Sequence, residues 1–82
     1  MIINLEEIYG KKQGKNALIS EIPNYINKTL ELLGTNTTDA ILTGAAPVWL
    51  YLVLTHALHG KVALLQYESP VTGRITIHDH RS

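Results

Sequence analysis

Apolar residues mark two predicted helices, at helical spacing in the first and around nearly the whole circumference in the second, and a glycine follows each. The first predicted helix covers residues 20–33, with Ser20 as a cap and Gly34 as the stop. Its expected apolar face consists of Ile22, Ile26, Leu30 and Leu33. The second covers residues 47–59, before Gly60, and its apolar residues go nearly all the way round. Such a helix is buried on both sides, so in a small domain we expect its outer side to meet a second copy of the chain.

Shorter apolar or alternating stretches flank the helices and predict strands. They cover residues 1–8, 17–19, 40–43, 61–67 and 74–78. In the last strand, alternation puts Ile75 and Ile77 on the core face and the remaining face is formed by Arg74, Thr76, His78 and His80. The order ββαβαββ predicts one α/β domain over residues 1–82, a small two-layer sandwich with a mixed sheet and two helices on one face.

Composition narrows the function classes. The 82 residues carry 7 basic and 7 acidic side chains, so nothing indicates duplex nucleic acid or a membrane as a partner. The chain has no cysteine, which excludes disulfides and thiolate zinc sites. No apolar run approaches the roughly 20 residues of a membrane span, and the N-terminus lacks a signal-peptide pattern. We therefore expect a cytoplasmic protein. The balanced charge does not exclude a small nucleotide as a ligand, because a few local donors can hold one.

The junction between the third predicted strand and the second helix is a candidate anion site. It reads Gly44, Ala45, Ala46, Pro47 and Val48. A glycine turn that opens a helix presents free backbone N–H groups, and the helix dipole favours an anion there. The alternative is a tight turn that uses small residues for packing alone.

All four histidines lie in the last third of the chain: His56, His59, His78 and His80. Histidine titrates near neutral pH and is the commonest metal ligand. His59 at a helix C-terminus has a purely structural explanation through the helix dipole. His56 lies one turn before His59 on the same helix face, but no carboxylate accompanies these two histidines as in a zinc-protease motif. For His56 we therefore favour packing or an interface.

The final hairpin separates the candidate groups. With a turn over residues 69–73, Glu68 pairs with Arg74 and Val62 pairs with His80, which places His80 beside His59. Glu68 is then roughly 20 Å away, at six residues of strand. A carboxylate and the histidines could therefore meet only across a head-to-tail contact between two subunits. The alternatives are a surface ion pair for Glu68 and a frayed terminus for His80.

Several of these residues together resemble a known family. The stretch from Gly44 to Tyr51, His59, Tyr67-Glu68 and the terminal His80 are similar to the CRISPR-associated ring nucleases of the Csx-three (Crn-three) family. The resemblance covers about residues 40–80 and is sharpest at the Pro-Val-Trp-Leu run. It implies that the chain binds and linearises cyclic tetra-adenylate, the messenger of type III CRISPR signalling, and it implies manganese-dependent RNA cleavage. It also implies dimers that assemble further around the ligand, with active residues from different subunits.

Carried over by position, the resemblance assigns His59, Glu68 and His80 as catalytic residues and as ligands of Mn²⁺. The turn from Gly44 to Val48 would bind the substrate, and Arg74 would stand in for the family's hairpin arginine. The chain departs from the family in having Glu68 in place of aspartate and Val71 after Pro70 in place of arginine. These departures bear on cleavage more than on binding. A sensor or sponge that does not cleave the ring, and a small structural dimerisation protein, therefore stay as alternatives.

Overall fold

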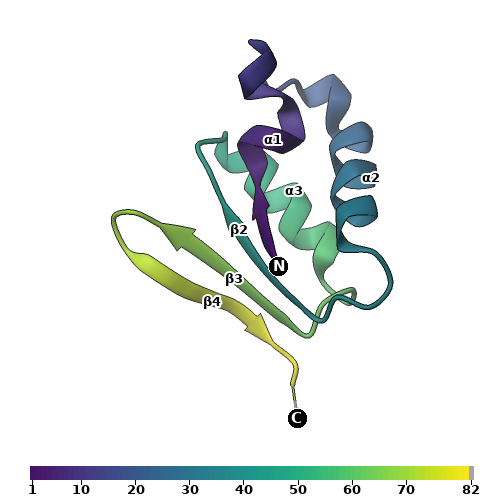
Figure 1. Ribbon diagram of the computed structural model, residues 1–82, viewed down its shortest axis with the longest axis vertical. Coiled ribbons are helices and arrows are strands. Elements are labelled where there is room, and N and C mark those ends of the chain that lie inside the picture. The colour runs from purple at the N-terminus through teal and green to yellow at the C-terminus, as the bar shows by residue number, and fades with distance from the viewer. Residues whose placement is uncertain (82) are drawn as a thin grey trace.

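The N-terminal segment changes from strand to helix at one residue. Strand β1 (Ile2–Asn4) stops where the Asn4 side chain accepts a hydrogen bond from the Glu6 N–H at 3.0 Å and caps helix α1 (Leu5–Tyr9). Residues 1–8 therefore contain a three-residue strand followed by a helix, rather than the single strand predicted. The computed structural model describes residues 1–81 (Figure 1).

The second predicted strand, residues 17–19, is wrong. The chain forms short 3₁₀ turns at η1 (Lys11–Gln13) and η2 (Ile19–Glu21) instead. The Tyr25 hydroxyl accepts the Leu18 N–H at 3.0 Å, so this backbone donor is satisfied by a helix side chain and not by a sheet.

Helix α2 (Ile22–Leu33) follows the prediction closely, with Pro23 in its first turn and Gly34 as its stop. Its fully buried residues are Tyr25, Thr29 and Leu33, while Ile26 and Leu30 are only half-buried beside the core. Ser20 does not cap it, because the 3₁₀ turn η2 leads directly into its first residues. The buried face is thus rotated from the predicted one. The Thr29 hydroxyl adapts by donating to the Tyr25 carbonyl at 2.8 Å.

The remaining elements complete a mixed sheet. Strand β2 (Asp39–Thr43) leads to helix α3 (Val48–Leu58), then to β3 (Leu64–Ser69) and β4 (Gly73–Asp79). Within residues 1–81 the sheet order is β1-β2-β3-β4, with β1, β2 and β3 parallel and β4 antiparallel to β3. The predicted α/β sandwich with a mixed sheet is confirmed, with the short α1 as an additional helix.

The core lies between the first three strands and the helices. Leu50, Leu54 and Leu58 of α3 are fully buried against Leu42 of β2 and Leu65 of β3. Helix α3 lies behind the sheet in Figure 1, whereas the β3–β4 hairpin extends away from the helices.

Strand β4 therefore does not reach the core, contrary to the prediction for its isoleucines. Ile75 is 46% exposed and Ile77 is 40% exposed. The cause is position: β4 is the outer strand of the sheet and the hairpin extends away from the helices, which alternation alone cannot report.

Candidate functional site

A β-bulge in the hairpin decides which face the last histidines share. Glu68 pairs with Arg74 as predicted, but the register shifts between Leu65 and Gln66, so that Leu65 pairs with His78. A bulge sets two residues of one strand against one of its partner. His80 consequently lies opposite Ala63, to which its N–H donates at 2.7 Å, and the predicted pairing of His80 with Val62 is wrong.

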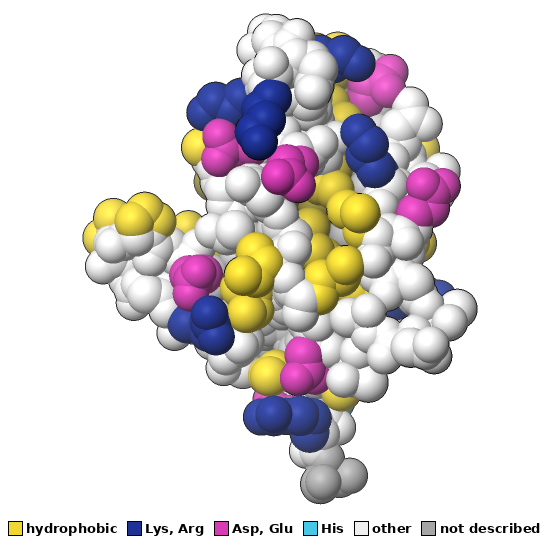
Figure 2. All heavy atoms as spheres, viewed as in Figure 1, with side chains coloured by type: hydrophobic (Ala, Val, Ile, Leu, Met, Phe, Trp, Pro, Cys, Tyr) yellow, Lys and Arg dark blue, Asp and Glu magenta, His cyan; other side chains and the backbone are white. Residues whose placement is uncertain are grey.

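The prediction that Arg74, Thr76, His78 and His80 share one face of β4 is also wrong, because the bulge moves the two histidines to the other face. Arg74 and Thr76 lie on the open face of the sheet, where they bond Glu68 and Gln66. His78 and His80 lie on the face that carries α3. Figure 2 views the open face and shows acidic and basic side chains beside each other over the hairpin, with no histidine in view.

Three imidazoles come together at the C-terminal end of α3. His59 is the C-cap residue of α3, and its ring centroid is 5.2 Å from that of His78 and 5.2 Å from that of His80. The His78 and His80 centroids are 4.6 Å apart. His59 and His80 are exposed, whereas His78 is half-buried. The expected convergence of His59 and His80 is present, and we call these three residues the histidine cluster.

His78 is the member of the histidine cluster that sequence reasoning left without a role. Its Nε2 lies 3.0 Å from the carbonyl oxygen of Val62. Only the bulge turns His78 toward this carbonyl, and strand alternation contains no signal for a bulge at Ile77. His56 is exposed on α3, one turn before His59.

Glu68 is not part of the histidine cluster. It accepts hydrogen bonds from Arg74 Nη2 at 2.9 Å and from Nε at 3.2 Å, on the open face at the far end of the hairpin. Both side chains are substantially exposed, so the pair contributes little to stability. Within residues 1–81, no group of three or more His, Asp or Glu side chains is placed to hold a metal ion. The predicted set of His59, Glu68 and His80 thus does not form inside one chain.

Glu68 lies instead beside the candidate anion turn. The Thr43 hydroxyl, directly before Gly44, donates to the Glu68 carbonyl at 2.9 Å. Glu68 and the turn from Gly44 to Val48 therefore share one end of the sheet, which we call the turn end. The histidine cluster lies at the other end of α3, about 16 Å away for a helix of 11 residues.

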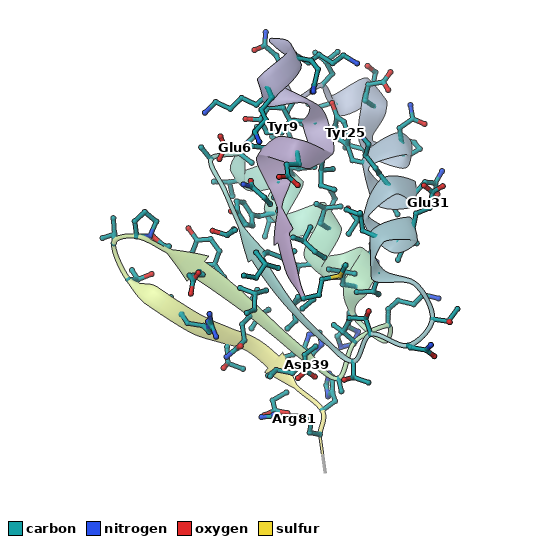
Figure 3. All side chains as sticks on the ribbon, viewed as in Figure 1. Glu6, Tyr9, Tyr25, Glu31, Asp39 and Arg81 are labelled. Atoms are coloured by element: carbon teal, nitrogen blue, oxygen red, sulfur yellow. The ribbon has the colours of Figure 1, made fainter. Side chains whose placement is uncertain are left out.

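The turn itself already holds an anion of the chain. The Ala45 N–H donates to Glu6 Oε2 at 3.2 Å, and Lys11 Nζ lies 3.1 Å from Glu6 Oε1. The hydrogen bond from Lys11, followed by that from Ala45, lowers the pKa of Glu6. Figure 3 shows Glu6 and Tyr9 on α1, at the end of the molecule opposite Asp39 and Arg81.

Two tyrosines hold the carbonyl groups of the same turn. Tyr51 donates to the Gly44 carbonyl at 2.6 Å, and Tyr9 donates to the Ala45 carbonyl at 2.8 Å. Burial, with smaller contributions from Tyr67 and Glu6, raises the pKa of Tyr51 to about 12. Gly44 has φ +107°, and a side-chain Cβ there would overlap the Asn4 amide oxygen. The turn is therefore rigidly built, with its N–H groups as the candidate ligand donors.

The outer side of α3 is apolar and open. Val48 is 74% exposed and Leu52 is 64% exposed, and His56 continues the same row at helical spacing. This row, the α3 stripe, runs from the turn end toward the histidine cluster. Within residues 1–81, no helix is both long and apolar enough to cross a membrane.

Comparison with known proteins gives one finding. The family model of the CRISPR-associated protein described as Cas_csx3 matches residues 21–82, which includes α2, α3, the hairpin and the histidine cluster. No curated protein and no solved structure gave a significant match.

Proposed function

Because the chain belongs to the Cas_csx3 family of CRISPR-associated proteins, we propose that it binds a cyclic oligoadenylate, cyclic tetra-adenylate first of all, and opens the ring as a phosphodiesterase in the cytoplasm. Family membership covers the CRISPR association. The ligand and the reaction are those that the family resemblance implies, and the arrangement of the site supports them.

One observation carries this proposal: the candidate groups are divided between two ends of the domain. The turn end offers backbone N–H groups with Glu68 and Arg74, and the opposite end offers three imidazoles. Neither end has both a phosphate-binding turn and an acid–base pair. A head-to-tail contact between two subunits would bring the turn end of one subunit against the histidine cluster of the other, around a cyclic ligand.

The chemistry of such a site follows from its side chains. Cleavage of an RNA phosphodiester needs one group that accepts the proton of the attacking 2′-oxygen and one that donates a proton to the leaving 5′-oxygen. His59 and His80 are exposed and close together, and an imidazole can both accept and donate a proton. The turn from Gly44 to Val48 of a neighbouring subunit would hold a phosphate beside these histidines, together with Glu68 and Arg74 of that same neighbouring subunit.

The α3 stripe supports the dimer that this arrangement needs. A row containing Val48 and Leu52 that is left open to solvent is typical of an interface. We propose that two copies associate through this row and that ligand drives the further head-to-tail contact.

The first experiment is a cleavage assay. Pure protein is incubated with cyclic tetra-adenylate, with and without manganese, and the products are resolved by chromatography. Linear products that disappear in His59→Ala, His80→Ala and Glu68→Ala, but persist in Glu7→Ala on the exposed side of α1, would support a ring nuclease. The manganese arms test the metal, whose remaining ligands would have to come from a second copy.

The second experiment tests the division between subunits. The double variant His59→Ala/His80→Ala is mixed with Glu68→Ala. If the groups belong to different subunits, mixed assemblies contain contacts with all three wild-type residues and regain part of the activity. If the groups act within one subunit, mixing restores nothing. Each variant alone is the control.

A non-cleaving sensor is the second candidate, and one observation favours it. Arg74 is tied to Glu68 by two hydrogen bonds, and Val71 is the residue at the position of the family's arginine. Stoichiometric binding that leaves the ring intact would identify this function. Absence of binding would leave the structural dimerisation protein.

A further inference from the structure

We infer that His78 is a positioning residue, which sets the orientation of His59 and His80, and this inference rests on the proposed function. In a regular strand His78 would pair with Leu64 on the open face, whereas the bulge pairs it with Leu65 on the face that carries α3. Irregular strand geometry of this kind commonly re-aims a side chain next to a functional site.

The hydrogen bond of His78 fixes its protonation pattern. The Val62 carbonyl oxygen is only an acceptor, so the contact at 3.0 Å requires a proton on Nε2 of His78. In the neutral ring Nδ1 is then left without a proton. A histidine held by a backbone carbonyl in this way has one tautomer and one ring plane.

Val62 links this bond to His59. Val62 is buried, its N–H donates to the Leu58 carbonyl at 3.2 Å, and it forms a β-bridge with His59. His78 therefore fastens β4 to the loop in which His59 ends α3. The backbone pairing of β4 with β3 and the His80 N–H to Ala63 also hold this end of the hairpin, but the bond from His78 to Val62 is made by a side chain of the histidine cluster.

The ring of His78 also contacts both neighbours. It meets His59 edge to face at an interplanar angle of 87° and lies tilted by 32° against His80. His59 and His80 are exposed, so their rings have few other restraints. The half-buried His78 is the member of the histidine cluster that is fixed, and the other two pack on it.

The test compares His78→Ala with His78→Gln, because glutamine places an N–H near the position of Nε2 and can keep the bond to Val62. The first readout is the χ1 rotamer populations of His59 and His80 from NMR couplings at a pH where the rings are neutral. We expect averaging in His78→Ala and the wild-type populations in His78→Gln. His56→Ala, outside the histidine cluster, is the control.

The second readout is the steady-state cleavage assay. We expect kcat to fall about 10- to 100-fold in His78→Ala with little change in KM, as for other residues that orient a reacting group, and to recover largely in His78→Gln. Unchanged rotamers in His78→Ala, or glutamine as damaging as alanine, would overturn the inference. If the wild-type protein does not cleave the ring, the proposed reaction fails, while the NMR comparison still decides the role of His78.

Discussion

The carboxylate of Glu6 accepts a hydrogen bond from the N–H of Ala45 at 3.2 Å, across 39 residues of chain. This N–H belongs to the turn that would hold a phosphate. A phosphate that binds this turn therefore meets the negative charge of Glu6, which already occupies one N–H donor of the turn. Lys11 pairs with the other oxygen of Glu6 and offsets part of that charge.

Replacement of Glu6 by glutamine should strengthen binding. Its amide oxygen can still accept from Ala45, while the repulsion of a ligand phosphate, about 1 kcal/mol at 4 Å in water, is removed. We expect the Kd for cyclic tetra-adenylate to fall about fivefold by isothermal titration calorimetry. Glu7→Gln on the same helix removes an equal charge away from Ala45 and should leave Kd unchanged. Weaker binding in Glu6→Gln would mean that the phosphate does not approach this turn.

Gly44→Ala should destabilise the fold more than the same change at another positive-φ glycine. An alanine at this position would have to adopt φ +107°, and its Cβ would overlap the Asn4 side chain that caps α1. Urea unfolding should show a loss of about 3 kcal/mol. Gly14→Ala, at φ +76° with open space around it, should lose only about 1 kcal/mol. Equal losses would show that the contact with Asn4 carries no cost.

The acidic end of β4 gives a pH-dependent prediction. Hydrogen bonds from the Arg81 side chain and N–H lower the pKa of Asp79 to about 2. A depressed carboxyl pKa favours the folded state above the ordinary value of 3.8, and this contribution is lost as the pH falls through about 2. Carboxyl ¹³C titration by NMR should find that low midpoint.

The control for Asp79 is Arg81→Gln, which removes the charged donor and leaves the backbone N–H. We expect the midpoint of Asp79 to rise toward 3.8 in this variant. A midpoint that does not move would assign the shift to another group.

Leu52→Glu should prevent self-association. Leu52 is 64% exposed in the α3 stripe, where a charge would be buried in the proposed dimer. Light scattering after size exclusion should report a monomer with wild-type helicity. Leu32→Glu, on α2 and 49% exposed, is the matched control and should remain a dimer. A monomeric wild-type protein would contradict the interface.

Much of the fold was predictable because local rules decide it. The periodicity of α2, the apolar run of α3 between Pro47 and Gly60, and the glycine after each helix predicted both helices, and the turn residues of the hairpin predicted the pairing of Glu68 with Arg74. The strand predicted at residues 17–19 failed because the Tyr25 hydroxyl, a tertiary partner, takes the Leu18 N–H. The apolar pattern of Ile75 and Ile77 describes a strand but not which element, if any, covers it.

The candidate site was less predictable because its decisive contacts are distant in the chain. The hydrogen bond between Glu6 and Ala45 joins segments with no common motif. The role of His78 depends on a bulge, which alternation cannot reveal. The convergence of His59 and His80 was predictable because a helix end and a strand end that adjoin the same loop must lie together.

The bulge at Ile77 has a consequence for how relatives are compared. It lets Arg74 and His80, six residues apart, face opposite sides of the sheet, which a regular strand achieves only at an odd separation. A homologue with one residue fewer in this strand would present the same two groups on the same two faces with no bulge at all. A single-residue gap in an alignment here would therefore mark conserved geometry rather than a lost site.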